Sequence, residues 1–373
     1  MKRRRLFSLL GLLILALAVW FYATRSEAPI GDQIDPVPKK PGTFRIAFGS
    51  CNKQWKPNYM WRAILNSKPD VWIWLGDSVY APTEDTAHLK SQYEVQKQKP
   101  EYQQLTKSCR VIGTWGDNDY GMKNGNGSYS RKAESQQLFL DFLDEPKDSP
   151  RRKQKGVYAS YLFGEPGKQI KIVLLDEFYD AQESGPQNDL LGEEQWTWLA
   201  DELRDRQDKI VLLGSSIQLL PSEHPYGHWG DFPKARQRLL KMLAEAKPKL
   251  TVIASGDRHL AEISRSDDTG LGYPLYEITS SGLTHHVDPI YHLRSFFSPE
   301  INRYRVGTPY YQKNFGLVDI DWSSTSPVVS LQVRDQENEV QRQEAIPLSQ
   351  IRYENSRSVS GRRVEPSLDS DVW

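Results

Sequence analysis

Four short apolar segments of the chain are each followed, within a few positions, by side chains that can bind a metal ion. In each case a small residue marks the end of the apolar run, and glycine at such a point lets the backbone turn sharply and approach a ligand closely. The four stretches that follow the apolar runs are Gly49-Ser50-Cys51-Asn52, Gly76-Asp77-Ser78-Val79-Tyr80, Trp115-Gly116-Asp117-Asn118-Asp119 and Ser255-Gly256-Asp257-Arg258-His259.

These stretches together supply a thiol, several carboxylates, a phenol and an imidazole. Ligands of α/β sheets bind outside the carboxyl ends of the strands, so four such loops can bring these groups to one place. The softer groups suit a transition metal and the oxygens suit a harder cation, so the set could hold two ions. Two ions fit the hydrolysis of a phosphate ester, because one lowers the pKa of a water and both neutralise the phosphoryl oxygens. A carboxylate such as Asp77 can bridge two ions through its two oxygens.

Each of these residues also has an ordinary structural interpretation. An Asp after a strand is commonly a turn residue or a helix cap. His259 could simply be hydrogen-bonded, and Tyr80 could be an ordinary core residue. Cys51 could be a small buried hydrophobe, or it could form a disulfide with Cys109. The combination of four such loops in one chain is far more specific than any single member.

The two cysteines are expected to lie far apart. Cys51 follows one predicted strand and Cys109 precedes a different one, which places them at opposite ends of the sheet. A strand of four or five residues spans about 15 Å, whereas the Cα atoms of bridged cysteines lie within about 7 Å. We therefore expect no disulfide, with Cys51 a metal-bound thiolate and Cys109 free.

The elements that position these loops follow from hydrophobic periodicity. Short apolar runs typical of buried strands alternate with segments of helical spacing, which predicts an α/β core. The predicted strands are 44–48, 71–75, 111–114, 170–175, 210–213 and 250–254, and the predicted helices are 59–65, 135–143, 193–205 and 233–246. After residue 273 the predicted strands 276–279, 315–321 and 328–333 have no helices between them, so we expect them to form a second, partly antiparallel sheet.

The chain begins with Lys2 and three arginines, followed by an uncharged apolar run from Leu6 to Tyr22. This layout is typical of a secretory signal or a signal anchor, and the cations favour a cytoplasmic N-terminus. Cleavage after Ala18 would leave Val19 to Tyr22 at the new terminus, so we favour an anchor. Residues 1–25 are therefore predicted to be the signal segment, 26–43 a Pro-rich spacer, 44–353 one domain outside the cytoplasmic membrane, and 354–373 a flexible tail.

Composition excludes some classes of function. The chain has 373 residues, and its 48 basic side chains balance its 48 acidic ones. A nucleic-acid-binding protein would usually carry a basic excess, so we expect no specific nucleic-acid recognition. The expected partners are a phosphate-ester substrate and the membrane, the latter through the N-terminal segment. We expect the protein to be a monomer.

The motifs together resemble the PhoD-like (alkaline phosphatase D) metallophosphatases, within the calcineurin-like phosphoesterase superfamily. The matching pieces are Phe48 to Asn52, Trp74 to Tyr80, Thr114 to Gly121, Ser255 to His259 and Glu277 to Thr284, within a resemblance that runs from about Arg45 to about Tyr353. It implies a four-layer α-β-β-α sandwich of two mixed sheets. It also implies iron, as Fe³⁺, on Cys51, Asp77, Tyr80 and His259, and calcium or another divalent cation near Asp77, Asp117 and Asp257.

The chain departs from the family pattern at three positions. Gly116 and Asn118 stand where relatives usually have Asp and His, and Phe178 stands where they usually have Arg. Asn can donate a hydrogen bond but cannot supply a proton near neutral pH, and losing an Arg removes a bidentate phosphate clamp.

We assign catalytic roles to Asn118 and Arg258, and substrate binding to Asn52, Asp119 and Gln218. Gln218 could equally cap a helix or sit in a turn. His285, His286 and the loop from Pro221 to Asp231 could border the site or be ordinary surface.

Two hypotheses follow for the function. The first is a phosphoric ester hydrolase of the alkaline phosphatase or phosphodiesterase type, acting on mono- or diesters at a binuclear or multinuclear metal site. The second is a degenerate relative that binds metal and phosphate, or a polyanionic polymer, with little turnover. The changes at Asn118 and Phe178 favour the second. The retained Cys51, Asp77 and His259 favour the first, because a cluster of buried polar ligands is costly to keep without a use.

Overall fold

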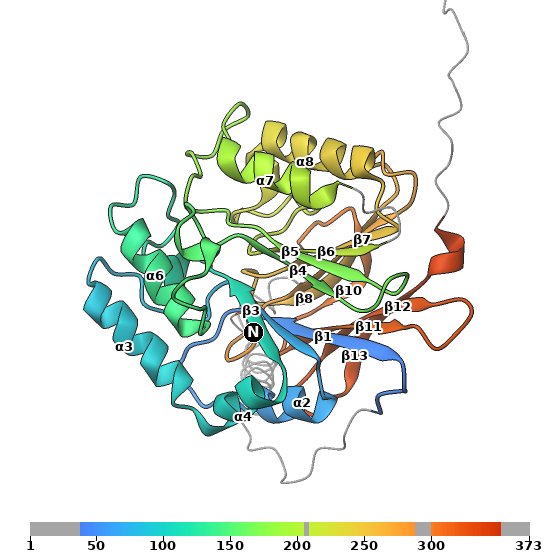
Figure 1. The fold of residues 1–373 in the computed structure, drawn as a ribbon, viewed down its shortest axis with the longest axis horizontal. Helices are drawn as coiled ribbons and strands as arrows, with labels where there is room; N and C mark the ends of the chain where they lie inside the picture. Colours follow the sequence, from blue (N-terminus) through green and yellow to red (C-terminus); the bar gives the residue numbers. More distant parts are fainter. Residues whose placement is uncertain (1–37, 205–208, 288–299, 352–373) are drawn as a thin grey trace, which may run out of the picture.

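A computed structural model of the chain describes residues 38–204, 209–287 and 300–351, and Figure 1 shows two β-sheets packed face to face with helices outside them. The predicted signal segment, most of the predicted spacer and the predicted tail lie outside the described residues. None of the helices in the described ranges is long and apolar enough to cross a membrane.

The first sheet has six strands and combines parallel with antiparallel pairs. Its order is β13-β12-β11-β1-β2-β3, with β1, β2 and β3 parallel and the pairs that join β1, β11, β12 and β13 antiparallel. The strands are β1 (Thr43–Gly49), β2 (Val71–Leu75), β3 (Arg110–Thr114), β11 (Phe315–Asp321), β12 (Val328–Arg334) and β13 (Val340–Pro347). Three of the four ligand loops follow β1, β2 and β3, so the parallel part of this sheet brings them to one edge.

The second sheet has seven strands in the order β10-β8-β9-β7-β6-β5-β4. Strands β5, β6, β7 and β9 are parallel, and the remaining pairs are antiparallel. The strands are β4 (Ala159–Phe163), β5 (Ile170–Leu174), β6 (Ile210–Ser215), β7 (Leu250–Ser255), β8 (Ala261–Ser266), β9 (Leu275–Ser280) and β10 (Arg305–Tyr310). The fourth ligand loop follows β7, so the loops of both sheets contribute to one site.

The expectation that the last strands form a sheet of their own is wrong. Strand β9 pairs in parallel with β7, whereas β11 pairs antiparallel with β1 and continues the first sheet through β12 and β13. Periodicity shows that a segment is a strand but does not identify its partner, and here each late strand extends one of the two sheets. The six earlier strands and the α/β class are confirmed, as is the four-layer sandwich of two mixed sheets.

The helices cover the outer faces of the sandwich. They are α2 (Met60–Ser67), α3 (Thr86–Lys97), α4 (Pro100–Ser108), α5 (Asp117–Tyr120), α6 (Lys132–Phe142), α7 (Glu193–Leu203) and α8 (Pro233–Ala246), with short 3₁₀ turns at Pro150–Arg152, Trp229–Asp231 and Leu348–Gln350. Figure 1 shows α7 and α8 over the second sheet and α2 and α4 over the first. Helices α3 and α4 were not predicted, because charged and polar residues dominate both segments.

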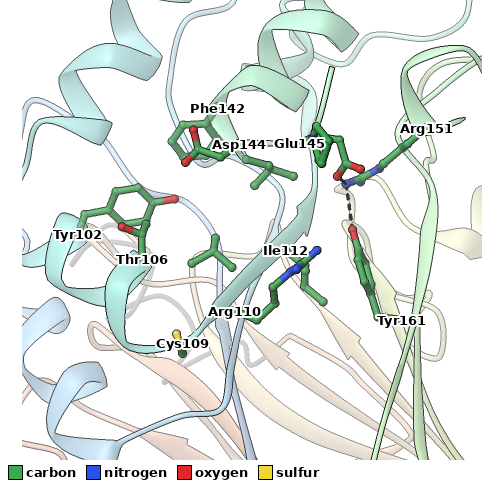
Figure 2. Close-up of a pocket in the computed structure, with 13 residues that line it drawn as sticks. Tyr102, Thr106, Cys109, Arg110, Ile112, Phe142, Asp144, Glu145, Arg151 and Tyr161 are labelled. Atoms are coloured by element: carbon green, nitrogen blue, oxygen red, sulfur yellow. Dashed lines mark hydrogen bonds and ion pairs between the residues drawn. The ribbon is translucent and has the colours of Figure 1, made fainter. Parts of the chain in front are cut away.

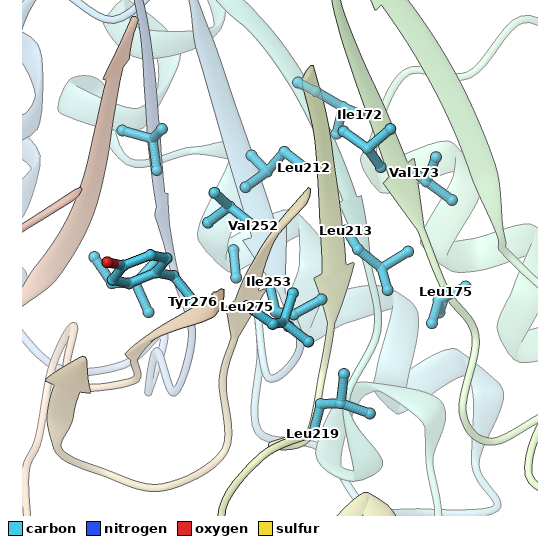
Figure 3. Packing of buried hydrophobic residues seen from close by; sticks show 14 of the residues in the cluster. Ile172, Val173, Leu175, Leu212, Leu213, Leu219, Val252, Ile253, Leu275 and Tyr276 are labelled. Carbon is cyan, nitrogen blue, oxygen red and sulfur yellow. The ribbon is translucent and has the colours of Figure 1, made fainter. Parts of the chain in front are cut away.

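Strand β2 illustrates how side chains that alternate between the two faces of a strand connect the layers of the sandwich. Val71, Ile73 and Leu75 pack into the core between the sheets, whereas Trp72 and Trp74 point to the other face and pack against Trp61 of α2. Both faces are therefore buried, which is why the sequence reads as one continuous apolar run. Figure 3 shows the corresponding packing in the second sheet, where Leu212 lies between Ile172 and Val252 on neighbouring strands.

Candidate metal centre

Two overlapping groups of metal-binding side chains lie where the four loops meet. Cys51, Asp77 and His259 form one group, and Asp77, Asp117 and Asp257 form the other. Within each group the ligand atoms all lie within 4.8 Å of one another. Asp77 belongs to both groups, so its carboxylate has the position of a bridge between two ions.

The backbone at these residues adopts an uncommon conformation. Of nine non-glycine residues with positive φ in the described ranges, four are predicted ligands: Cys51 (61°), Asp77 (51°), Asp257 (69°) and His259 (55°). Such conformations cost of order 1 kcal/mol or more each for residues with a side chain, and they gather at functional sites. The loops therefore accept strain in order to aim these side chains at one point.

Gly116 and Gly256 allow the loops to approach one another closely. A Cβ atom on Gly116 would lie 2.5 Å from Asp77 Oδ1, and one on Gly256 would clash with the Leu75 carbonyl oxygen. A side chain at 116 would therefore displace the Asp77 carboxylate or the backbone of one of the two loops. The close approach of Asp77 explains why glycine suits this position.

The Asn118 side chain is hydrogen-bonded to both ligand groups. Its Nδ2 donates to Asp77 Oδ2 (3.0 Å) and to Asp117 Oδ1 (2.8 Å), and its backbone N–H donates to Asp77 Oδ1 (3.2 Å). Asn118 is 8% exposed and lies on the first turn of α5. The residue predicted to be catalytic is thus placed among the predicted ligands, where it orients two of their carboxylates.

Asp119 points into the protein rather than toward the ligand groups. Its carboxylate is fully buried and accepts hydrogen bonds from the backbone N–H groups of Asp77, Ser78 and Gly116 and from the Ser78 hydroxyl. Burial raises the pKa of Asp119 to about 6, although these four donors favour the ionised form. The side chain predicted to bind substrate instead ties the loop after β2 to the loop after β3.

Asn52 and Gln218 also direct their side chains into the protein. Asn52 donates to the Ser78 carbonyl oxygen and to Gln96 Oε1. Gln218 donates to Glu262 and Thr279, and its Oε1 accepts a hydrogen bond from Arg258 Nε (3.1 Å). Both side chains are fully buried. Gln218 therefore reaches the site through Arg258, and the structure does not bring Asn52 to the ligand atoms.

Arg258 is held by three neighbours. Besides the bond to Gln218, its Nη2 lies 2.5 Å from Glu300 Oε1, and its guanidinium lies over the Tyr226 ring at 4.5 Å. The side chain is almost fully buried, whereas Tyr226 is 45% exposed. Tyr226 belongs to the loop that was expected either to line the cleft or to be ordinary surface, and the structure places this ring against a predicted catalytic residue.

The electrostatics of the cluster favour a bound cation. Burial raises the pKa of Cys51 well above its usual value, and Asp77 and Asp257 raise it further. Burial likewise raises the pKa of Asp77, with additional repulsion from Asp117, Asp119 and Asp257, and it raises the pKa of Asp257 to about 7. Negative charge on these groups is therefore unfavourable unless a cation offsets it, and the donor set of thiol, carboxylates, phenol and imidazole fits metal ions.

Tyr80 and His259 are accompanied by a second imidazole, that of His285. The Tyr80 hydroxyl oxygen lies 3.1 Å from His259 Nε2 and 3.2 Å from His285 Nε2, and the two Nε2 atoms lie 3.2 Å apart. From the sequence, His285 was only a residue that could border the site. A single His after a loop of small residues shows no spacing that is typical of a metal ligand.

Glu177 and Phe178 occupy the segment after β5 where the family resemblance predicts an Arg. The Phe178 ring packs against the Tyr120 ring, with their centroids 5.5 Å apart, so Phe178 is part of the hydrophobic core. Glu177 Oε2 accepts from the Ser216 hydroxyl and backbone N–H, whereas its buried Oε1 has no hydrogen-bond partner in the described structure. Burial raises the pKa of Glu177 to about 7.

The two cysteines are not joined, as the strand argument predicted. Cys51 is buried beside Asp77 with its Sγ 3.7 Å from Asp77 Oδ2, and Cys109 is partly buried between the end of α4 and the start of β3. A cavity of about 250 Å³ lies beside Cys109, between the edge strands of the two sheets, and is lined by Tyr102, Arg110, Arg151 and Tyr161 among others (Figure 2). It shares no residue with either ligand group.

Comparisons with known proteins identify the family and the fold. The profile of the PhoD-like phosphatase family matches residues 46–330. The solved structure of PhoD superposes with a TM-score of 0.60 at 15% identity, covering 85% of this chain and 70% of PhoD, which shows a shared fold. A 5'-nucleotidase precursor from Thermus thermophilus is more distant, with a TM-score of 0.37 at 12% identity over 82% of this chain and 54% of its own. No curated protein sequence gives a significant match.

The family match spans well over half of the chain and contains all four ligand loops. This family consists of metal-dependent hydrolases of phosphoric esters, and the two ligand groups are the candidate sites for the metal. The chain therefore belongs to the PhoD-like phosphatases.

Proposed function

We propose that this protein hydrolyses phosphate mono- or diesters at a binuclear or multinuclear metal site outside the cytoplasmic membrane. The single observation that carries the proposal is the position of Asp77. Its carboxylate is common to a group that contains a thiol and an imidazole and to a group of three carboxylates. One residue shared by a softer and a harder ligand set is the arrangement that two different cations require.

The proposed metals follow from the two ligand sets. Cys51, Asp77, His259 and Tyr80 would hold iron, as Fe³⁺, and Asp77, Asp117 and Asp257 would hold calcium or another divalent cation. When bound, such ions activate a water and stabilise the charge that develops on the phosphoryl oxygens. Asn118 keeps the Asp77 and Asp117 oxygens oriented through its two hydrogen bonds.

Arg258 is the proposed contact for the phosphoryl group. It adjoins Asp257 in the sequence, and Gln218 and Glu300 fix the direction of its guanidinium. A guanidinium held in one orientation loses little entropy when it binds an anion, which favours recognition of a phosphate. We propose that Gln218 acts as a positioning residue and that Asp119 supports the ligand loops.

The location outside the membrane is inferred from the sequence. The basic residues before the apolar run of residues 6–22 support a cytoplasmic N-terminus, with the hydrolase domain on the other side.

The direct test of function is hydrolysis of p-nitrophenyl phosphate and bis(p-nitrophenyl) phosphate by the purified full-length chain, before and after treatment with a chelator.

We expect turnover of at least one ester, loss of that turnover with chelator, and recovery when metal is restored. Cys51→Ser should lose metal and turnover together, whereas Cys109→Ser, at the opposite end of the sheet, should keep both. Metal binding without turnover of either ester would favour the degenerate relative that binds phosphate or a polyanionic polymer.

A further inference from the structure

The three atoms Tyr80 Oη, His259 Nε2 and His285 Nε2 form a triangle whose sides are 3.1, 3.2 and 3.2 Å. The side chains come from three separate segments, the loop after β2, the loop after β7 and the loop after β9. The His259 and His285 rings meet nearly edge to face with centroids 4.3 Å apart, and Tyr80 contacts the His285 ring in the same manner. Three rings are therefore aimed at one point.

The neighbours of Thr284 determine which nitrogen of His285 carries a proton. The Thr284 hydroxyl donates to the Cys51 carbonyl oxygen and accepts from the Lys53 backbone N–H. Because its one hydrogen is used, the contact of 3.2 Å with His285 Nδ1 requires that Nδ1–H be the donor. In a neutral imidazole this leaves His285 Nε2 with a lone pair directed into the triangle.

A lone pair in this position needs an electrophilic partner. The Tyr80 hydroxyl has one hydrogen and can satisfy only one of the two imidazole nitrogens. If His259 Nε2 binds the metal, as proposed above, two nitrogen lone pairs face one another at 3.2 Å. A cation shared by all three atoms removes this conflict. Ligand atoms about 2.1 Å from an ion lie roughly 3.0 Å apart in octahedral geometry and roughly 3.4 Å apart in tetrahedral geometry, which brackets the observed sides.

We propose that His285 is a further ligand of the metal ion held by Tyr80 and His259, and that Thr284 fixes the tautomer through which it binds. His285 belongs to neither group of mutually close ligand atoms, and its Nε2 lies beside Tyr80 Oη and His259 Nε2, so it would bind the ion from the side of these two residues. A ligating His that donates its other ring N–H to an oxygen is the arrangement common to protein metal sites. This assignment rests on the proposed function, because it needs the same metal ion.

Zinc titration tests the ligand assignment without relying on activity. Full-length protein is stripped of metal and titrated with Zn²⁺ against a competing chelator. His285→Asn should weaken the tighter zinc site by about tenfold to a hundredfold or more, and Thr284→Val should weaken it by about tenfold because the ring loses its fixed tautomer. His286→Asn is the matched control, because its ring nitrogen contacts the backbone oxygen of Val287, and it should bind zinc as the wild type does.

The outcomes distinguish an error in the His285 ligand assignment from an error in the proposed function. Equal zinc affinity in wild type and His285→Asn, with both proteins showing the same cooperative thermal unfolding, would overturn the ligand assignment and leave the proposed function intact. A wild type that binds no zinc and no iron would overturn both. If His285→Asn fails to fold, His285→Gln supplies the same comparison, because Thr284→Val would also disturb the loop that carries Cys51.

Discussion

At the scale of single residues, the loop after β3 carries an amide, Asn118, at the position where the family resemblance predicts an imidazole. Asn118 donates hydrogen bonds to Asp77 and Asp117 but has no proton to give a leaving group near neutral pH. The rate of ester hydrolysis should therefore depend strongly on how well the leaving group departs without being protonated. Esters of acidic phenols should react much faster than esters of simple alcohols.

Replacing Asn118 by His tests this explanation. The variant should hydrolyse alkyl esters about tenfold or more faster than the wild type, while esters of acidic phenols change little, because these need no protonation. The measurement is kcat across a series of leaving groups. An equal loss for every ester would show that Asn118 serves the metal ligands alone.

The sequence predicted the ligands better than it predicted their supporting residues. Cys51, Asp77, Asp117, Asp257 and His259 follow strand ends with glycine nearby, and the structure brings them together in the two ligand groups. Asp119 has the same sequence context, yet its carboxylate points inward to backbone N–H groups. Loop dihedral angles decide between these directions, and residue types alone do not determine them.

At the scale of elements, the site depends on how the loops are tied to one another. Asp119 of α5 joins the loop after β2 to the loop after β3 through four hydrogen bonds. Asp119→Ala would leave three backbone N–H groups and one hydroxyl without their acceptor. We expect a loss of about 3 kcal/mol or more in the free energy of unfolding, together with weaker metal binding, because Asp77 is one of the tied residues.

Chemical denaturation and metal titration of Asp119→Ala measure these two effects. Asp148→Ala is the control, because Asp148 is exposed on a different loop, and it should change stability by less than about 0.5 kcal/mol. Weaker metal binding without a loss of stability would mean that Asp119 acts on the metal directly.

The turn after β5 contains a buried acid whose ionisation should make stability depend on pH. Burial raises the pKa of Glu177 to about 7 in the folded protein, from about 4.5 in the unfolded chain, so the folded state holds this proton more tightly. Its contribution to stability is fully present below pH 4.5 and is lost as the pH rises to about 7.

Glu177→Gln removes this dependence. The difference in melting temperature between the variant and the wild type should shift in favour of the variant between pH 5 and pH 8. Glu165→Gln, in an exposed turn, should show no such trend. If the difference in melting temperature stayed constant between pH 5 and pH 8, the pKa of Glu177 would lie outside this pH range.

At the scale of the whole molecule, the sandwich brings strand ends from both sheets to one site. Alternation of strands and helices predicted the α/β class, and the motifs predicted the four layers through resemblance. The pairing of β11 with β1 was not predictable, because antiparallel partners far apart in the sequence are chosen by packing across the finished core. For the same reason, the strands after residue 273 were wrongly expected to form a sheet of their own.

The orientation of the molecule at the membrane is a prediction at this scale too. The cations that precede the apolar run favour a cytoplasmic N-terminus and an exported hydrolase domain. A fluorescent reporter that matures only in the cytoplasm should stay dark when fused to the C-terminus, and a periplasmic or surface reporter at that position should be active. The reverse pattern would place the hydrolase domain in the cytoplasm.

The most direct test of the metal centre is elemental analysis of the wild type beside Asp77→Asn. Asn tolerates the positive φ of 51° at this position but lacks the charge needed to bridge two cations. We expect the wild type to hold iron and at least one further cation per chain, and Asp77→Asn to lose both while Cys109→Ser keeps both. A wild type that hydrolyses esters with no stoichiometric metal, or an Asp77→Asn variant that retains both ions, would contradict a metal centre built around Asp77.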